Sequence, residues 1–399
     1  MCWTIPIRAF ESLGVSNSHL TLGILGGGQL ARMMILAGAP LGLRFVVLEP
    51  ADECCAAHLA DRIQGEYADH EALEKFAAQA DVATFDFENV PAASVKKLAA
   101  SLPVFPPELA LATAQDRLSE KSLFNSLGIG TPAFAEVDSR EALEAAIARI
   151  GGPAILKTRR LGYDGKGQFR LRSAEDADAA WTALGAQAKR VGLILEGFVK
   201  FERELSVVAV RSREGEFRAF PITQNWHVDG VLSVSLAPAD VSPALAAQAI
   251  EHAKKVAEAL NYVGVFALEL FDCGGNLLAN EMAPRVHNSG HWTIEGAETS
   301  QFENHLRAVL GMPLGSTAPR GYSCMLNFIG ELPDRDALLS IPGAHWHDYG
   351  KSARPGRKTG HATLRADSRE ALIGQLERAG RALGREAQVA PVLERLRAS

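Results

Sequence analysis

A predicted β-hairpin that carries two glutamates constrains this chain more than any other feature of its sequence. Val263–Phe271 is apolar and rich in β-forming residues, Asp272–Asn276 has the composition of a turn, and Leu277–Glu281 returns as a second short strand. Glu269 and Glu281 then share one face of an apolar sheet. Two carboxylates in such a place repel each other and lose hydration, so the hairpin predicts a cation between them.

The register of the hairpin sets the geometry of this cation site. With the turn centred on Gly274, Glu269 faces Ala279, and Glu281 is its diagonal neighbour, roughly 7–8 Å away at the backbone. Mg²⁺ prefers one or two carboxylates together with substrate phosphates, so we expect Glu269 and Glu281 to hold one or two Mg²⁺ ions. The alternative is a solvated hairpin with surface carboxylates, which the apolar neighbours of Glu269 disfavour.

Length and composition limit the class of protein. A chain of 399 residues exceeds one compact core, so two or three domains are expected, and 47% hydrophobic with 22% charged residues is typical of a soluble globular protein. The net charge of -6 argues against a nucleic-acid partner. No apolar run reaches the ~18–20 residues of a membrane span, so no membrane partner is expected.

The cysteines and the N-terminal segment bear on location. Five scattered cysteines without metal spacing indicate reduced thiols and a cytoplasmic protein: Cys2, Cys54, Cys55, Cys273 and Cys324. Residues 1–19 lack a continuous apolar core and contain Glu11, so we expect a disordered extension rather than a targeting segment.

Residues 20–115 have the order of a Rossmann-like domain. Leu20–Leu25 is a short strand that leads into Gly26–Gly28, Gln29–Ala37 has helical character, and Arg44–Leu48 is a second strand. This β–α–β order predicts a parallel sheet flanked by helices. We expect the glycine turn and the helix N-terminus to offer bare N–H groups to a phosphate.

Two interpretations of this glycine turn stay open. The pattern Gly26-x-Gly28-x-x-Ala31, followed by Glu49 in the place of a ribose-binding acid, matches the dinucleotide fingerprint. Any other phosphate group fits the same turn equally well in physical terms.

The end of the next strand is acidic. Val82–Phe87 is predicted to end at the sheet edge where ligands bind in such folds, and Asp86 and Glu88 alternate with aromatic residues there. A capping turn before Pro91 is an alternative that explains Asn89 better than it explains the two acids.

A glycine-rich loop dominates residues 116–200. After predicted helices at Gln115–Leu127 and Arg140–Ile150, the strand Ala154–Thr158 carries Lys157, and the loop at 162–168 follows. Its glycines indicate a flap whose backbone can lie against a ligand, and the surrounding cations indicate polyphosphate. It lacks the spacing of a Walker A loop. A β-hairpin tip is the alternative, which leaves Lys157 unexplained.

A hinge is predicted after the strand Leu193–Leu195. The strand ends in Glu196 and continues as the extended segment Gly197–Val199, where we expect free backbone groups that adenine can read. Glu196 or Glu204 is then placed to accept hydrogen bonds from ribose hydroxyls.

Residues 201–399 contain further strands, helices and polar loops. Arg285, His287, Asn288 and His291 lie within seven positions, and cations cluster between Lys351 and Lys358. Because glycine and proline punctuate the second cluster, it predicts a second anion site, with a solvated charged face as the alternative. The segments predicted as regular elements are Glu204–Arg211, Glu216–Phe220, Pro243–Leu260, Phe302–Leu310, Tyr322–Ile329 and, as the helix that closes the chain, Glu370–Leu383.

Five motifs follow one another along the chain: Gly-Gly-Gly-Gln-Leu at 26–30, Gln-Asp-Arg-Leu-x-Glu-Lys at 115–121, Gly-Tyr-Asp-Gly-Lys-Gly-Gln at 162–168, Asn-Glu-x-Ala-Pro-Arg-x-His-Asn-Ser-Gly-His-Trp-Thr at 280–293 and Arg-Pro-Gly-Arg-Lys-x-Gly-His at 354–361. Motifs in this order resemble a known family, the N5-carboxyaminoimidazole ribonucleotide synthetases. The likeness runs from about Leu20 to the C-terminus, and Arg285–Thr293 is its most specific block. Asp86 departs from the pattern, since the family more often has glutamate there.

The resemblance implies an α/β chain with α+β parts and a three-domain ATP-grasp architecture. A Rossmann-like pre-ATP-grasp domain with a parallel sheet would occupy 20–115, a lid 116–200, and the domain with metal and substrate sites 201–399. The implied enzyme is an ATP-dependent ligase of purine biosynthesis and a homodimer. ATP phosphorylates bicarbonate to carboxyphosphate, and the amine of 5-aminoimidazole ribonucleotide takes up the carboxyl group, giving ADP and phosphate.

The resemblance also implies roles for individual residues. ATP would bind Arg117, Lys157, Gly162, Tyr163, Asp164, Gly165, Lys166, Gly167, Gln168, Glu196, Gly197, Phe198, Val199, Glu204, His227, Asn280 and Glu281. The ribonucleotide would bind Gly28, Gln29, Leu30, Asp86, Glu88, Asn288, Ser289, Lys351, Arg357 and Lys358. The implied catalytic residues are Tyr163, Asp164, Lys166, Arg285 and His287, and the metal ligands are Glu269 and Glu281. Asp164 on the glycine loop is placed to take a proton from the attacking amine when the loop closes.

Three rival functions remain. Another ATP-grasp carboxylate–amine ligase, such as a formate-dependent glycinamide ribonucleotide transformylase, shares the nucleotide motifs. An NAD(P)-dependent oxidoreductase would rest on the Gly26–Ala31 fingerprint and Glu49. A nucleotide-binding regulator without catalysis would not need the pair Glu269 and Glu281.

Overall fold

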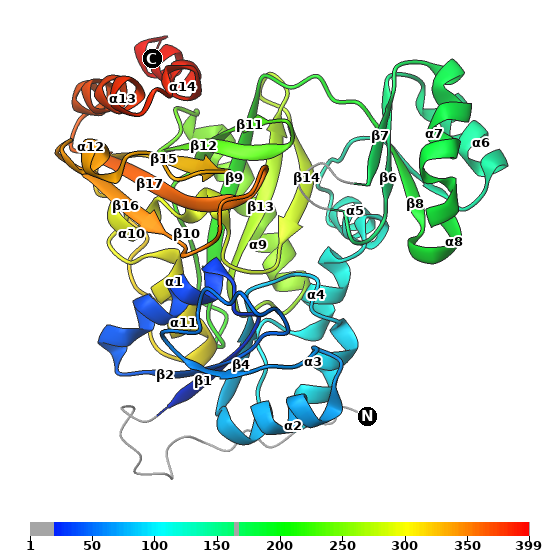
Figure 1. Cartoon of the computed structure of the whole chain (residues 1–399). Coiled ribbons are helices and arrows are strands. Elements are labelled where there is room, and N and C mark those ends of the chain that lie inside the picture. Colours follow the sequence, from blue (N-terminus) through cyan, green and yellow to red (C-terminus); the bar gives the residue numbers. More distant parts are fainter. Residues whose placement is uncertain (1–19, 163–166, 399) are drawn as a thin grey trace.

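Three β-sheets organise the protein, which we describe from a computed structural model (Figure 1). The structure describes residues 20–162 and 167–398, so the expected disorder of 1–19 lies outside the described residues. The α/β class and the parallel N-terminal sheet are confirmed. Each helix in these two ranges is too short or too polar to cross a bilayer.

The N-terminal sheet is parallel and has the order β3-β2-β1-β4. Its strands are β1 (Thr21–Leu25), β2 (Arg44–Leu48), β3 (Asp61–Ile63) and β4 (Val82–Phe85), and its helices are α1 (Gln29–Gly38), α2 (His70–Gln79), α3 (Ala92–Leu98) and α4 (Glu108–Ala114). The inner strands β1 and β2 are apolar and almost wholly buried, because helices cover both faces of a parallel sheet.

The central sheet is large and mostly antiparallel, with the order β14-β13-β9-β11-β12-β15-β17-β16 and with β10 paired to β9. Its strands are β9 (Arg203–Arg211), β10 (Phe217–Ala219), β11 (Thr223–Val228), β12 (Val231–Ala237), β13 (Gly264–Asp272), β14 (Leu277–Ala283), β15 (Tyr322–Ile329), β16 (Ala344–Asp348) and β17 (Lys358–Ala366). Its helices are α9 (Pro243–Ala259), α10 (Thr293–Gly296), α11 (Gln301–Leu310), α12 (Arg335–Leu339), α13 (Arg369–Leu383) and α14 (Glu386–Ala398).

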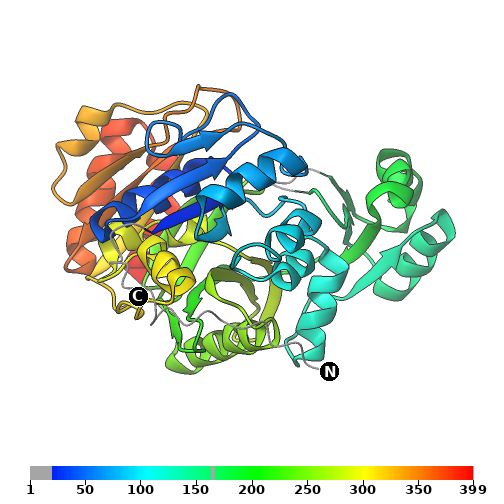
Figure 2. The same cartoon turned by 90° about the horizontal axis from the view of Figure 1, so that it is seen from below.

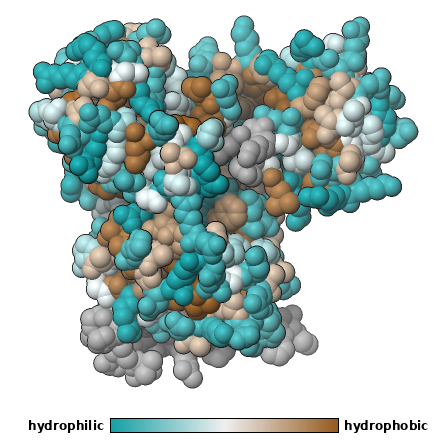
Figure 3. All heavy atoms as spheres, viewed as in Figure 1, coloured by the Kyte–Doolittle hydropathy of each residue, from teal (hydrophilic) through white to brown (hydrophobic). Residues whose placement is uncertain are grey.

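A third sheet stands apart from the other two (Figures 1 and 2). It is antiparallel with the order β5-β8-β6-β7, from β5 (Phe134–Val137), β6 (Ala154–Thr158), β7 (Gln168–Leu171) and β8 (Leu193–Gly197). Helices α6 (Arg140–Ile150), α7 (Ala177–Leu184) and α8 (Ala188–Val191) accompany it, and α5 (Arg117–Ser126) precedes it. The space-filling view shows a recess between this lobe and the rest of the molecule (Figure 3).

The structure corrects three expectations about these elements. Glu269 pairs directly with Glu281 instead of Ala279, because Asp272 pairs with Leu277 instead of Asn276 and a bulge between Glu269 and Leu270 shifts the register by one further residue. Glu196 and Gly197 belong to β8 and pair with neighbouring strands, so they are not in an extended hinge. Helix α14 follows α13, so α13 does not close the chain.

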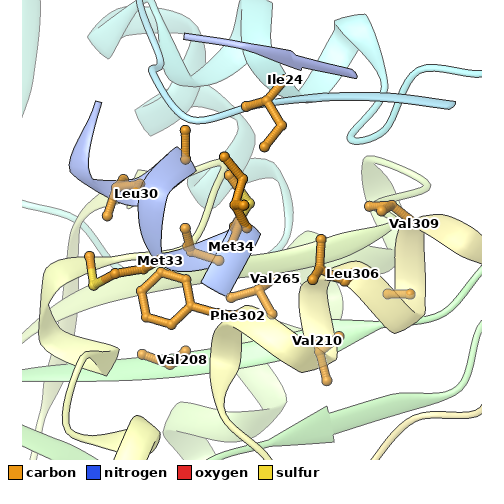
Figure 4. Packing of buried hydrophobic residues seen from close by; sticks show 14 of the residues in the cluster. Ile24, Leu30, Met33, Met34, Val208, Val210, Val265, Phe302, Leu306 and Val309 are labelled. Atoms are coloured by element: carbon orange, nitrogen blue, oxygen red, sulfur yellow. The ribbon is translucent and has the colours of Figure 1, made fainter. Parts of the chain in front are cut away.

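One continuous core joins the N-terminal sheet to the central sheet (Figure 4). Helix α1 contributes Leu30, Met33 and Met34, which pack towards α11. Helix α11 in turn packs on β9 and β13 through the side chains of Phe302, Leu306 and Val309. Because packed helices and sheets tolerate little displacement, this core fixes the start of α1 relative to the hairpin β13–β14.

His305 adds polar contacts to this junction. It lies on α11 and is fully buried. Its Nδ1 accepts a hydrogen bond from the Val265 backbone N–H at 3.0 Å, and its Nε2 lies 2.8 Å from Thr84 Oγ1 on β4. Nε2 therefore carries the proton of a neutral ring, and burial lowers the pKa of His305 to about 3.

This histidine predicts a pH dependence of stability. Below pH 6.5 the unfolded chain binds a proton that folded His305 refuses, so stability falls as the pH drops from 6.5 towards 3. The contribution of His305 to the free energy of unfolding should fall by up to roughly 1.4 kcal/mol for each unit by which the pH drops in this range. Urea unfolding at pH 7 and pH 5 should show a shallower pH dependence for His305→Gln than for the wild type. His70→Gln, at an exposed histidine, is the control; equal slopes in wild type and His305→Gln would refute the assignment.

Candidate active site

The three sheets enclose a cavity of about 1000 Å³. Most of the site residues expected from the sequence line it: Gly28, Gln29, Leu30, Asp86, Glu88, Arg117, Lys157, Gly162, Gly167, Gln168, Glu204, His227, Glu269, Asn280, Glu281, Arg285, His287, Asn288, Lys351, Arg357 and Lys358. Five others are not among its lining residues: Glu196, Gly197, Phe198, Val199 and Ser289. Tyr163, Asp164, Gly165 and Lys166 lie outside the described residues.

The carboxylates of Glu269 and Glu281 meet at the hairpin β13–β14. Each has a partner on another element, since Arg117 Nη1 donates to Glu281 Oε2 at 2.9 Å and His287 Nε2 lies 3.3 Å from Glu269 Oε1. Burial and the neighbouring Glu281 raise the pKa of Glu269 to about 7. Burial acts in the same direction on Glu281, but the guanidinium of Arg117 outweighs it and lowers the pKa of Glu281.

The raised pKa of Glu269 reflects its burial and the charge of Glu281, and a bound cation would offset both effects. The donor set suits a hard divalent ion, because Glu269 and Glu281 supply oxygen ligands and Asn280 lies beside them on β14. Among the described residues, no group of three or more His, Cys, Asp and Glu residues is arranged to hold a metal. An ion at this pair therefore needs further ligands from a bound molecule or water.

Asp86 caps part of the N-terminus of α1, which corrects the expectation of bare N–H groups for Gly28 and Ala31. Asp86 Oδ2 accepts from the backbone N–H groups of Gly28 at 2.9 Å and Ala31 at 3.1 Å. Burial raises the pKa of Asp86 to about 6. Gly26 has a φ of +107°, and a Cβ there would lie 1.7 Å from Asp86 Oδ1, so only glycine fits.

Glu49 is not available as a ribose-binding acid either. Its Oε2 accepts from the Gly27 backbone N–H at 2.7 Å and from the Tyr67 hydroxyl at 3.2 Å, and its Oε1 accepts from the Ala51 N–H at 2.9 Å. Glu49 and Asp86 thus bind backbone N–H groups of the glycine turn that a dinucleotide phosphate would need. This arrangement opposes the NAD(P)-dependent alternative.

The lysines near β8 form ion pairs with Glu196, so they are not free cations beside the glycine loop. Lys157 Nζ donates to Glu196 Oε2 at 2.8 Å, and Lys121 Nζ lies 3.5 Å from the same oxygen. Although burial opposes it, these two ammonium groups lower the pKa of Glu196 to about 2. Glu196 Oε1 is buried and has no hydrogen-bond partner among the described residues.

The backbone after Glu196 is not free, contrary to expectation. The N–H groups of Gly197 and Phe198 donate to Ala133 O at 2.8 Å and Pro153 O at 3.0 Å. Gly197, Phe198 and Val199 line a second cavity of about 390 Å³ instead of the large one. A nucleotide base can therefore reach the N–H groups of Gly197 and Phe198 only by displacing these bonds.

The block Arg285–Asn288 forms the wall beside the metal carboxylates. Arg285 Nε donates to Glu88 Oε2 at 2.5 Å, which ties this wall to the end of β4. Although burial opposes it, Arg285 lowers the pKa of Glu88. His287 Nδ1 accepts from the Ser289 N–H at 3.3 Å, so Nε2 carries the proton and points to Glu269. Burial and the charge of Arg285 lower the pKa of His287 well below its usual range.

His227 and Glu204 face each other on β11 and β9. His227 Nδ1 lies 3.0 Å from Glu204 Oε2. Although burial opposes it, this carboxylate raises the pKa of His227. The pair therefore gives the cavity a charged rim beside β13.

The cationic loop between β16 and β17 is fastened to the N-terminal sheet. Lys351 Nζ donates to Gln29 Oε1 at 2.5 Å. Arg357 Nη1 lies 2.8 Å from Glu53 Oε2, and the Ser352 N–H donates to Glu53 Oε1 at 2.7 Å. Glu53 thus holds a cation that we expected to serve a ligand, and nothing in the sequence singled this acid out.

Sequence reasoning also missed a buried polar cluster behind the cavity wall. The Tyr349 hydroxyl lies 2.8 Å from His361 Nδ1, and the rings of His361 and His347 stack with centroids 4.2 Å apart. Asn327 on β15 exchanges hydrogen bonds of 3.1 and 2.6 Å with Asn288. The alternating polar residues of His345–Asp348 were the one available signal for β16.

Two aromatic rings were missed as well. Phe201 and Phe271 both line the large cavity and stack with centroids 4.6 Å apart. The ring of Phe201 is 38% exposed, so it offers an apolar face at the cavity mouth. A planar ligand group that stacks on this face buries apolar surface, which is more favourable than leaving that surface in water.

Comparison with known proteins gives three consecutive family matches along the chain. Residues 19–115 match the ribonucleotide synthetase preATP-grasp domain, 122–302 the ATP-grasp domain, and 323–375 the phosphoribosylaminoimidazole carboxylase C-terminal domain. The N5-carboxyaminoimidazole ribonucleotide synthase of Pseudomonas aeruginosa is 52% identical over 90% of this chain and 98% of its own length. The protein of that name from Brucella melitensis is 48% identical over 86% and 95%.

Solved structures agree with these matches. The N5-carboxyaminoimidazole ribonucleotide synthetase of Thermus thermophilus superposes with a TM-score of 0.87 at 55% identity, over 91% of this chain and 98% of that one. The Aspergillus clavatus enzyme, solved with ADP and 5-aminoimidazole ribonucleotide, has a TM-score of 0.82 at 31% identity, over 96% and 100%. The chain therefore belongs to the N5-carboxyaminoimidazole ribonucleotide synthase family of ATP-dependent ATP-grasp ligases.

Proposed function

We propose that this protein carboxylates 5-aminoimidazole ribonucleotide with bicarbonate at the expense of ATP, in de novo purine biosynthesis. Bicarbonate is phosphorylated to carboxyphosphate, the ribonucleotide amine forms a C–N bond with its carboxyl carbon, and ADP and phosphate leave. The observation that carries the proposal is the opposed pair of Glu269 and Glu281, which lies in a cavity shared by the glycine-loop flanks and the cationic loop.

The nucleotide end of the cavity supports ATP binding. Lys157 and Gln168 from the third sheet, with Gly167 just before β7, line the same cavity as Asn280 and Glu281 from β14. Mg²⁺ held by Glu269 and Glu281 would neutralise charge on the transferring phosphoryl group. The stacked rings of Phe201 and Phe271 add an apolar face suited to a base, although the hinge residues we expected there line the other cavity.

The acceptor end of the cavity supports ribonucleotide binding. Gln29 and Lys351 meet at the start of α1. Arg285 and His287 line the same cavity, and His287 lies beside Glu269. Asp86 and Glu88 are already engaged by the helix N-terminus and by Arg285. We therefore assign these two acids to shaping the site, and the cations Lys351 and Lys358 to anionic groups of the substrate.

Proton transfer is assigned to the glycine loop. Asp164 would accept the proton that the amine loses as the C–N bond forms, and closure of the loop would keep water from carboxyphosphate. Gly162 and Gly167, which flank the four residues outside the described range, both line the cavity and support this placement.

The assembly and the domain boundaries are part of the same proposal. We propose that the protein is a cytoplasmic homodimer and that its domains span residues 20–115, 116–200 and 201–399. Helix α5 packs against β14 of the central sheet, so the lid is attached to the body through this helix.

The metal assignment predicts the result of one substitution. Glu281→Gln should keep the fold but lose ADP release by at least roughly a hundredfold, because the ion loses a charged ligand where phosphoryl charge develops. ADP release with bicarbonate and 5-aminoimidazole ribonucleotide is the measurement. Glu258→Gln on α9 is the control at an exposed ion pair; unchanged ADP release in Glu281→Gln would remove the metal assignment.

The proton-transfer assignment predicts a separation of binding from turnover. Asp164→Asn should bind ATP with wild-type affinity but lose productive turnover with the ribonucleotide by roughly 10²–10⁴-fold, since the amide cannot accept the proton. ATP binding by calorimetry and product formation by chromatography test the two halves. Wild-type turnover by the asparagine variant would exclude Asp164 from the mechanism.

The contact between Lys351 and Gln29 predicts a selective loss. Lys351→Met should raise KM for the ribonucleotide roughly tenfold or more and leave KM for ATP within about twofold, because the lost cation lies at the acceptor end only. Steady-state kinetics with each substrate varied in turn is the measurement, with the exposed Lys97→Met as control. Equal increases in both KM values would contradict the placement of the two ends.

A further inference from the structure

Helix α5 covers the outer edge of the strand that carries the metal ligand. Because β14 is the last strand of the central sheet, its outward backbone groups need partners from outside the sheet. Three of them have such partners: Ala279 N–H donates to Gly130 O at 2.7 Å, Asn280 O accepts from Lys121 Nζ at 3.1 Å, and Met282 N–H donates to Glu120 Oε1 at 2.6 Å. The position of β14 is therefore set by α5 and the turn after it.

Lys121 has a second partner on a different sheet. Its side chain is fully buried, and its Nζ lies 3.5 Å from Glu196 Oε2 on β8 in addition to its bond with Asn280. One ammonium group thus joins the edge strand of the central sheet to a strand of the third sheet. A shift of β8 relative to β14 must lengthen at least one of these two contacts.

The residues next to these contacts belong to the proposed nucleotide site. Asn280, whose carbonyl oxygen Lys121 binds, directly precedes Glu281 in β14. Arg117 lies one helical turn before Lys121 on α5 and donates to Glu281 at 2.9 Å. Glu196, the other partner of Lys121, also binds Lys157, which lines the cavity. The network therefore runs from β8 through α5 to the metal carboxylate.

Stability alone does not account for a lysine at this position. A buried ammonium group loses its hydration, and apolar residues of similar volume in place of buried ion pairs often leave stability unchanged or improve it. Leucine or methionine would fit the helix equally well by propensity. A buried charge with one partner on each sheet is better explained by control of their relative position.

We propose that Lys121 is a positioning residue for nucleotide binding, which couples the place of β8 in the third sheet to that of Asn280 and Glu281 on β14. The inference rests on the proposed function, because the nucleotide must bind between these two sheets. Lys121 does not line the cavity, so it acts through Asn280 and Glu196 without touching substrate.

Lys121→Met tests this inference, with binding of MgADP and of 5-aminoimidazole ribonucleotide measured separately by calorimetry. We expect the Kd for MgADP to rise roughly tenfold, the size of a typical coupling between sites, while the Kd for the ribonucleotide stays within about twofold. Lys254→Met, at a half-exposed lysine on α9, is the matched control and should leave both Kd values unchanged. A purely structural role would weaken both ligands together and lower Tm.

A double-mutant cycle with Glu196→Gln tests whether Lys121 affects nucleotide binding through its contact with Glu196. If the contact carries the coupling, the effects of Lys121→Met and Glu196→Gln on the MgADP Kd will be non-additive. Additive effects, an unchanged Kd in Lys121→Met, or an equal loss for both ligands would each overturn the inference. If Lys121→Met does not fold, Lys121→Gln replaces it under the same criteria. Failure of the wild type to bind MgADP would refute the proposed function itself.

Discussion

Electrostatic repulsion between two buried carboxylates is the constraint on which the rest of this structure depends. Direct pairing of Glu269 with Glu281 brings like charges together in a poorly hydrated place. The protein relieves the repulsion only in part, with Arg117 beside one carboxylate and the neutral His287 beside the other. The negative charge that remains attracts a cation. The surrounding elements hold the carboxylate oxygens of Glu269 and Glu281 where a phosphoryl group can also coordinate that cation.

Several acidic side chains of the protein are paired with backbone N–H groups or cationic side chains of the same chain. Asp86 caps α1, Glu49 holds the glycine turn, and Glu53 holds Arg357. Asp86 and Glu49 bind N–H groups that serve an external phosphate in other folds of this type. The cavity is therefore preorganised at its N-terminal end, and Lys351 and Lys358 supply cations to its lining.

Local patterns in the sequence were sufficient for most of the fold. Apolar runs, glycine turns and helix caps predicted the parallel N-terminal sheet and the helix at Arg140–Ile150, both of which the structure contains. The bulge at Glu269 was not predictable, because one extra residue in a strand leaves no compositional trace. Strand β11 carries polar residues among apolar ones without a clear period, whereas β12 was missed although Leu232–Leu236 alternates apolar residues with serine.

The site was predictable as a set of residues but not as a set of contacts. Motif order named many of the side chains that line the cavity, whereas it did not show their partners, such as Glu53 for Arg357. Such pairs depend on packing between sheets, which no local pattern encodes. The expectation of a free hinge at Gly197 failed for the same reason, since its partner Ala133 lies on a separate segment.

Anomalous diffraction from crystals grown with Mn²⁺ and a non-hydrolysable ATP analogue tests the central claim most directly. The carboxylate pair predicts an anomalous peak between Glu269 and Glu281, with oxygens of both side chains and of the β- and γ-phosphates as ligands. A bound nucleotide whose metal ion lies away from both glutamates, or a nucleotide bound with no ion at this pair, would contradict the claim.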